Sequence, residues 1–351
     1  MRCMGAWQMS DDEGLMRENA ALVALLNTID RKRDSWSSIA ETVERNGSAL
    51  KVLMHEIDPR NNPLYDDEDP DDFENGEPTL FDDRDIPVSR ARAAELESAF
   101  DAALDEVDSW ERRGLDFVSV LDDRYPNRLR QVVDMPPFLF AEGRMVQDEL
   151  GVSVVGSRKA DAESLKFAQD TASMLVSCGF AVIAGLASGI DTAAHVRALE
   201  EGGRTVAFIG TGITKRYPRE NGTLQDRIGR DGLVLSQFWP DQGPTKYTFP
   251  MRNASMSGYG VATVVVQASE HSGTRIQARQ AQQHGRPVIL RDTVADGTEW
   301  GRKLASRPGV CVASTVDDVK ARLHDLLGMG RALEESVDML LSAGASRSND
   351  Q

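Results

Sequence analysis

The stretch from residue 151 to residue 195 constrains the fold most, because short apolar runs alternate there with helical patterns. The first run, residues 152–155, ends in a glycine-containing turn, and apolar residues at helical spacing follow it. A second run at 180–184 ends in another glycine-containing turn, which opens a second helix. Short buried strands that alternate with helices are typical of a parallel sheet covered on both faces. Ligands of such sheets bind at the carboxyl ends of the strands.

The same alternation continues to about residue 327, so the whole stretch is predicted to form one α/β sheet domain. Further strands are expected at residues 205–209, 233–238, 261–268, 287–290 and 310–312. Helices are expected at about 220–230, 250–258, 272–284, 299–305 and 316–327. Glycines separate these segments, as is usual at transitions between strands and helices.

The N-terminal part has a different pattern, which predicts a small all-α module over residues 14–57. Its second helix is expected to run over 35–45 and to end at Asn46-Gly47, and Ser48 is expected to cap a third helix. A longer helix over 91–113, a strand at 117–121 and an extended segment at 136–143 lead into the sheet domain. The predicted organisation is a helical module (1–60), an acidic insertion (61–90), the sheet domain (91–330, core from 151) and a tail without a winged helix (331–351).

The net charge of −16 argues at first against a nucleic-acid partner, but much of it is confined to one segment. Residues 66–85 contain eleven acidic residues and one arginine. Such a segment cannot bury its charges, so we expect a disordered or loosely ordered insertion. It is either a solvated linker or an internal mimic of DNA that competes for a cationic groove, and the sequence leaves both open.

Cysteine usage and hydropathy exclude several classes of protein. Cys3, Cys178 and Cys311 are scattered, which favours reduced thiols in a cytoplasmic protein, and no Cys/His spacing indicates a metal. There is no basic region followed by an apolar stretch at the N-terminus, and no apolar run is long enough for a membrane span. We therefore expect no metal, no cofactor and no membrane association.

Four turns with phosphate-binding chemistry are expected to meet at the carboxyl edge of the sheet. Glycine lets the backbone approach a phosphate, hydroxyl and arginine side chains donate hydrogen bonds, and aromatic rings beside cations suit stacked bases. The candidate residues are Gly156, Ser157, Arg158 and Lys159 in the first turn, Ser188, Gly189 and Asp191 in the second, Lys246, Phe249, Arg252 and Asn253 in the third, and Ser272, Gly273, Thr274 and Arg279 in the fourth turn and its helix.

Each candidate also has a simpler structural interpretation. Asp191 is as well placed to cap the following helix as to contact a ligand, and His195 fits a structural role better than a catalytic one. Phe249 is compatible with a place in the core. Arg275 and Arg279 together are compatible with a solvated helix face. The functional interpretation depends on four such turns occurring in one sheet.

The order of these motifs resembles the DNA-processing protein A family, also called DprA or Smf, over most of the chain. The motifs that carry the resemblance are Val154–Arg158, Ser188–Asp191 with Ala193–His195, Tyr217-Pro218-Arg219-Glu220-Asn221, Phe249–Asn253, Ser272–Arg279, and upstream Asp123–Pro126 with Pro136–Phe140. One departure is Ala254, which stands where the family motif continues with an arginine.

The resemblance implies an extended Rossmann-like domain, usually dimeric, preceded by a sterile-alpha-motif-like helical module. It implies a non-enzymatic protein of natural transformation and recombination that binds single-stranded DNA, cooperates with single-strand-binding protein and helps load RecA. By the same resemblance, Arg158, Lys246, Phe249 and Arg252 are DNA contacts, the glycine and serine turns form a phosphate pocket, and residues 286–327 contribute to the dimer.

Two other functions remain open at this point. Related Rossmann-like proteins of the LOG type cleave nucleoside monophosphates at the N-glycosidic bond and carry a glutamate after their Gly-Thr phosphate element. Here Gln277 or Ala278 stands in its place, and an uncharged side chain cannot balance an oxocarbenium charge. A sensor that binds a free nucleotide in the same pocket is compatible with all of the motifs. A nicotinamide enzyme is disfavoured, because no Gly-x-Gly-x-x-Gly follows the first strand.

Overall fold

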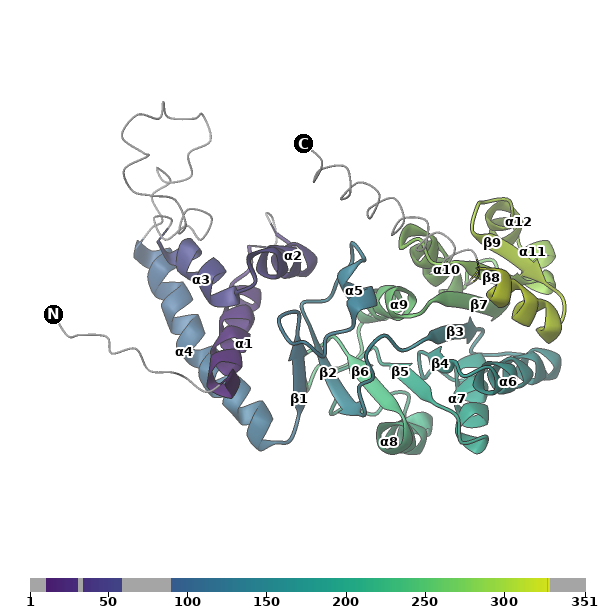
Figure 1. Cartoon of the computed structure of the whole chain (residues 1–351), viewed down its shortest axis with the longest axis horizontal. Helices are drawn as coiled ribbons and strands as arrows, with labels where there is room; N and C mark the ends of the chain where they lie inside the picture. The colour runs from purple at the N-terminus through teal and green to yellow at the C-terminus, as the bar shows by residue number, and fades with distance from the viewer. Residues whose placement is uncertain (1–10, 31–33, 59–89, 327, 329–351) are drawn as a thin grey trace, which may run out of the picture. The chain divides into compact units, whose positions relative to one another are not determined.

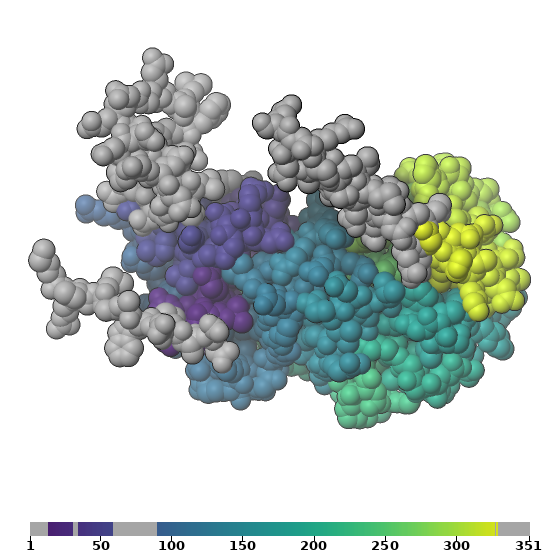
Figure 2. All heavy atoms as spheres, in the orientation of Figure 1, coloured from purple at the N-terminus to yellow at the C-terminus, as the bar shows by residue number. Residues whose placement is uncertain are grey.

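The computed structural model describes residues 11–30, 34–58, 90–326 and 328 (Figures 1 and 2). The chain forms two compact units, Met1–Gln147 and Asp148–Gln351. The acidic segment at 66–85 and the tail at 331–351 lie outside the described residues.

The first unit is mainly helical. Its elements are α1 (Asp11–Asn27), α2 (Trp36–Asn46), α3 (Ala49–Ile57), α4 (Arg90–Arg112), β1 (Asp116–Ser119), the short α5 (Asn127–Arg130) and β2 (Phe138–Gly143). The predicted helix ends are confirmed: Gly47 ends α2 at φ 63°, and the Ser48 hydroxyl accepts a hydrogen bond from the Lys51 amide at the start of α3. Helix α4, which the sequence grouped with the sheet domain, packs on α1 within this unit.

The second unit is the predicted α/β domain. Its elements are β3 (Gly151–Gly156), α6 (Ala162–Ser177), β4 (Ala181–Ala184), α7 (Ile190–Glu200), β5 (Thr205–Phe208), the 3₁₀ turn η3 (Arg219–Asn221), α8 (Gly222–Asp231), β6 (Leu233–Ser236), α9 (Thr248–Tyr259), β7 (Ala262–Gln267), α10 (Thr274–Gln283), β8 (Val288–Arg291), α11 (Asp292–Gly297), α12 (Glu299–Ala305) and β9 (Val310–Ala313). A last helix covers 316–326. Helix α11 was not predicted, because its six residues are too few to show a period.

The strands of this unit pair in parallel in the order β6-β5-β4-β3-β7-β8-β9. Helices α6, α7 and α8 cover one face of this sheet, and α9 and α10 pack together on the other (Figure 1). Within β3, Val152 and Val154 join the core formed with α6 and α7, whereas the Ser153 hydroxyl reaches α9 on the opposite face. The doubly wound sheet is therefore as predicted.

The strand order indicates where a ligand is expected to bind. From β3 the chain builds β4, β5 and β6 on one side, and then crosses to build β7, β8 and β9 on the other. The order therefore reverses between β3 and β7. In an open parallel sheet, the crevice outside the carboxyl ends of two such strands is where ligands bind.

His195 anchors α7 to the sheet. Its ring is fully buried, and Nδ1 lies 2.7 Å from the Thr205 hydroxyl, which itself donates to the Val182 carbonyl. Because the hydroxyl proton is already committed, the ring must donate from Nδ1. Burial lowers the pKa of His195, so the ring is neutral at neutral pH. This geometry supports the structural interpretation of His195.

The buried His195 ring makes stability depend on pH. Burial lowers the pKa of His195 to about 3, from an ordinary value of 6.5. Between these two values the unfolded chain binds a proton that the folded chain does not, so stability is complete above pH 6.5 and is lost as the pH falls. The expected loss between about pH 6.5 and about pH 5 is roughly 2 kcal/mol in the free energy of unfolding.

Chemical denaturation at a series of pH values tests this on wild type and His195→Gln. The variant lacks the titrating ring, so its free energy of unfolding should fall by about 2 kcal/mol less over the same interval. Comparing the two curves removes the contributions of all other groups. Parallel curves would show that His195 is not held neutral.

Candidate nucleic-acid interface

A pocket of about 260 Å³ lies at the point where the strand order reverses. Its walls come from the end of β3, from the first turn of α10 and from the start of α9. The predicted site residues that line it are Gly156, Ser157, Arg158, Asp191, Phe249, Arg252, Asn253, Ser272, Gly273 and Thr274. The structure thus brings together residues from all four predicted turns.

A second cavity of about 210 Å³ shares Arg158, Phe249 and Arg252 with the first. It also contains Ser188, whose hydroxyl donates to a carboxylate oxygen of Glu220 at 2.9 Å. Because these three residues and Ala187 line both spaces, the two cavities form one continuous site, which we call the edge site.

A cation and two aromatic rings form the centre of the edge site. The Arg158 guanidinium lies 5.5 Å above the centre of the Phe249 ring, and Phe249 lies 5.8 Å from the ring of Tyr217. A Cβ atom at Gly210 would lie 2.7 Å from the Phe249 ring, so a side chain at position 210 would collide with the ring in its present position. Arg158 is exposed and has no hydrogen-bond or ion-pair partner within the described residues. Its five N–H donors are available to a ligand.

Arg252 is positioned differently from Arg158, because its guanidinium is buried and donates hydrogen bonds within the protein. Nη1 donates to the carbonyl of Phe208 at 2.7 Å and to the carbonyl of Gly185, and Nε donates to the side chain of Asn253 at 3.0 Å. A Cβ atom on Gly185 would collide with this guanidinium. Burial lowers the pKa of Arg252 to about 10, which still leaves it charged at neutral pH.

Asp191 is the buried counter-charge of Arg252. Its carboxylate accepts hydrogen bonds from the amides of Gly185 at 3.0 Å and Ala187 at 3.3 Å. Burial raises its pKa, while the charge of Arg252 acts in the opposite direction. Of the two alternatives for Asp191, the structure does not show the helix cap: Gly189 is the N-cap of α7, and Asp191 holds the loop that precedes the helix.

The loop after β4 has a strained backbone that two further side chains support. Leu186 has φ 58°, in the left-handed region that non-glycine residues rarely adopt. The Asn221 amide donates to the Leu186 carbonyl at 2.8 Å and to the Thr192 hydroxyl at 2.9 Å. Strain of this kind concentrates where a surrounding network fixes a functional loop.

The backbone amides at the two helix N-termini of the edge site are used within the protein. The Ile190 amide at the start of α7 donates to the Ser157 carbonyl, so that end is partly used within the protein. Helix α10 begins after Gly273, which has no side-chain cap, and the Ser272 hydroxyl accepts from the Thr274 amide at 3.2 Å. The amides of Arg275, Ile276 and Gln277 also donate to the carbonyls of Ser272 and Gly273, so the first turn of α10 offers an anion the helix dipole rather than free amides.

Four predicted residues do not line the edge site. Lys159 is exposed outside it, and Gly189 has φ 83° with no room for a Cβ atom beside Ser157, so its role is conformational. The Lys246 ammonium lies 4.9 Å over the ring of Tyr247, and Arg279 lines a separate groove.

Three residues with polar side chains at the edge site were not predicted as site residues. Tyr217 and Glu220 belong to a motif that carries the family resemblance, and their position after β5 is the signal that marks them. Gln277 is buried beside the pocket, and its Nε2 has no partner within the described residues. Among those residues, no group of three or more His, Cys, Asp or Glu side chains is arranged to hold a metal.

Comparison with known proteins connects this geometry to a family. The sequence profile of DNA recombination-mediator protein A matches residues 116–323, which is more than half of the chain. The chain belongs to this family. The matched region of the DNA recombination-mediator protein A family contains every residue of the edge site.

Individual family members give the same result. The chain is 37% identical to the DNA processing protein DprA of Streptococcus pneumoniae over 208 residues, 59% of this chain and 73% of that protein. It is 34% identical to the Bacillus subtilis DprA over 52% of this chain and 62% of that protein. The crystal structure of the S. pneumoniae protein superposes with a TM-score of 0.57 over 65% of this chain and 81% of that one.

A DprA structure from Helicobacter pylori shares the fold at a TM-score of 0.51 and 22% identity, over 57% of this chain and 93% of that one. Along the described ranges of this chain, no helix is long and apolar enough to cross a membrane.

The buried position of Arg252 predicts a large effect on stability. Arg252→Gln removes a charged donor from two buried carbonyls, so the free energy of unfolding should fall by about 2 to 4 kcal/mol in urea denaturation. Arg158→Gln is the matched control: the same change on an exposed arginine should alter stability by no more than about 0.5 kcal/mol. Equal effects of the two substitutions would contradict the assignment of Arg252 as the group that holds the loop.

Proposed function

We propose that the edge site binds single-stranded DNA. The observation that carries the proposal is the exposed Arg158 guanidinium, which has no partner within the described residues and lies over the ring of Phe249, with Tyr217 beside it. A cation above stacking rings suits a strand whose bases are unpaired, because phosphates pair with the cation and bases stack on the rings. The DprA of H. pylori has a single-stranded DNA binding mode of its own, which supports the same class of ligand here.

The rest of the edge site supplies complementary groups. The Ser157 hydroxyl can donate to a phosphate, the positive end of the α10 dipole favours an anion, and Nε2 of Gln277 is a buried donor without a partner within the described residues. The negative net charge of the chain does not oppose this, since local potential governs the contact with a strand.

The family also motivates finer proposals about the role of the bound strand. We propose that the protein protects single-stranded DNA during recombination, acts with single-strand-binding protein, helps load a RecA-type recombinase and forms a homodimer through residues 286–327. These proposals are supported by the family membership and by the recombination-mediator description.

Strand binding should depend on salt and on two kinds of contact. Single strands lose affinity with a log–log slope near −0.7 per phosphate contact, so Arg158→Ala should weaken binding and make the slope shallower by about 0.7. Phe249→Ala should cost roughly 1–3 kcal/mol of binding free energy and leave the slope nearly unchanged, because stacking releases few counterions. Fluorescence polarisation with labelled oligo-dT over a salt series measures both quantities.

Arg230→Ala provides the control, because Arg230 is an exposed cation on α8 outside the edge site. It should change neither affinity nor slope beyond the general effect of one charge. Equal affinity for duplex and single strand, or an unchanged slope in Arg158→Ala, would exclude the edge site as the binding surface.

The N-glycosidase alternative leads to a separate prediction. Gln277 stands near the position of the catalytic carboxylate, and Glu270 lies outside the edge site, where it accepts the Glu299 amide at 2.8 Å. Glu220 is a carboxylate of the edge site, but it accepts a hydrogen bond from Ser188 and its pKa is lowered, so it does not serve as a general acid at neutral pH. Incubation with nucleoside monophosphates should release no base, as measured by chromatography. Release that Glu220→Gln abolishes would establish an enzyme instead.

A further inference from the structure

One carboxylate at the edge site has no counter-ion. Glu220 lines the smaller cavity of about 210 Å³ together with Arg158, Phe249 and Tyr217. Its side chain is exposed, and it forms no ion pair within the described residues. Arg158 lines the same cavity and also lacks an ion-pair partner in that part of the chain. A carboxylate and a guanidinium thus border one small space without pairing with each other.

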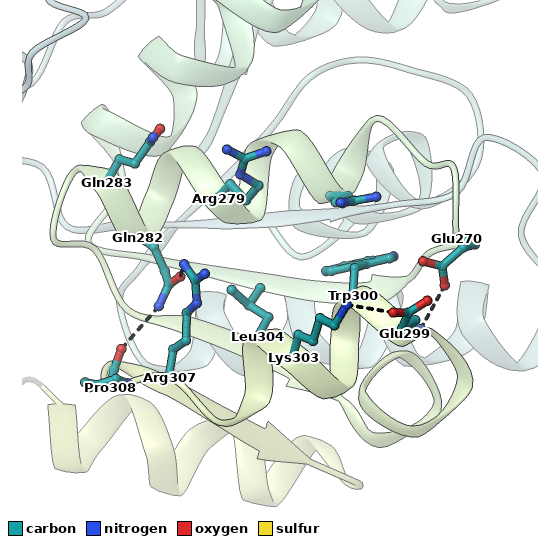
Figure 3. A pocket seen from close by; sticks show the side chains of 11 residues that line it. Glu270, Arg279, Gln282, Gln283, Glu299, Trp300, Lys303, Leu304, Arg307 and Pro308 are labelled. Atoms are coloured by element: carbon teal, nitrogen blue, oxygen red, sulfur yellow. Dashed lines mark hydrogen bonds and ion pairs between the residues drawn. The ribbon is translucent and has the colours of Figure 1, made fainter.

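Carboxylates of a neighbouring surface are engaged instead. In the separate groove that Arg279 lines, Glu299 pairs with Lys303 at 2.6 Å, and Glu270 accepts the backbone amide of Glu299 (Figure 3). An unpaired carboxylate beside a site for phosphates opposes binding, because like charges repel. Glu220 therefore favours a ligand that also presents hydrogen-bond donors, in addition to the anionic groups that suit the cations of the edge site.

The carboxylate of Glu220 is ionised and held in position. Its own backbone amide and the Ser188 hydroxyl, at 2.9 Å, donate to it and lower its pKa. The next residue, Asn221, is buried and donates to the Leu186 carbonyl at 2.8 Å, which fixes the backbone at this point. A carboxylate has about four acceptor sites, so two donors leave capacity for a ligand.

We propose that Glu220 accepts hydrogen bonds from the base that stacks on Phe249 and gives the edge site a preference for guanine. The inference rests on the proposed function of the edge site and adds a base preference to it. Guanine presents two adjacent donors, N1–H and the N2 amino group, which match the two oxygens of a carboxylate. Cytosine and adenine each offer one amino group. Thymine offers one N–H between two carbonyls, which a carboxylate repels.

Four strands of about nine nucleotides test this preference, each a repeat of TTX in which X is guanine, cytosine, adenine or thymine. With the wild-type protein, the guanine strand should bind on the order of tenfold more tightly than the thymine strand, because only guanine can form the bidentate pair. The cytosine and adenine strands should lie between these two. Fluorescence polarisation measures the four affinities at one salt concentration.

The variant Glu220→Gln keeps the size of the side chain and removes its charge. Its amide has one acceptor oxygen, so the guanine strand should bind more weakly, until the four affinities agree within about twofold. The thymine strand should bind more tightly than to the wild type, because the repulsion of its carbonyls is lost. These changes have opposite signs, whereas loss of the fold would weaken all four strands. Circular dichroism confirms that the variant is folded.

Glu200→Gln is the matched control, because Glu200 is exposed at the last residue of α7, the end of that helix away from the edge site. It should shift all four affinities equally. Equal affinity of the wild type for the four strands, or a guanine preference that survives in Glu220→Gln, would overturn the inference. Free dGMP that displaces the labelled strand as well as the guanine strand does would also overturn it, by showing a site for free nucleotides. Failure of Arg158→Ala to weaken any strand would instead refute the proposed function itself.

Discussion

The buried guanidinium of Arg252 is the contact on which the rest of the edge site depends. It donates to the carbonyl of Gly185, which follows β4, and to that of Phe208, the last residue of the neighbouring β5, and so fixes the spacing of the two strand ends. Asp191 balances its charge and holds the amides of the β4 loop. Removing water from this pair strengthens the attraction between the charges, but it also makes the loss of either partner costly. Gly185 is required because no side chain fits beside the guanidinium.

The guanidinium of Arg252 bonds to the protein interior, whereas that of Arg158 is exposed and can contact a ligand. The two guanidinium groups repel each other, since the charge of Arg158 contributes to the lowered pKa of Arg252. An anionic ligand at Arg158 would relieve part of that repulsion, so the buried charge favours an occupied site. The site therefore divides its functions: one arginine maintains the backbone geometry, and the other, with Phe249 and Tyr217, meets the ligand.

Helix α10 lines two separate surfaces of the second unit. Its first turn supplies Thr274 and Gln277 to the edge site, and its outer face supplies Arg275 and Arg279 to the groove. One rigid helix can thus serve two surfaces, because residues three and four apart share a face while their neighbours point elsewhere. This arrangement gives local positive surfaces to an acidic chain without altering its overall charge.

The residues by themselves determined the architecture, because strand–helix alternation, glycine turns and caps such as Ser48 are set by neighbours in the chain. They also identified the turns that meet at the carboxyl edge, since parallel strands with helical crossovers align those ends. Only the tertiary structure decided which cations face a ligand: Arg158 is exposed, Arg252 is buried, and Arg279 belongs to another groove. The pairing of Arg252 with Gly185 and of Phe249 with Tyr217 joins residues far apart in the chain, and local sequence periodicity contains no information about such contacts.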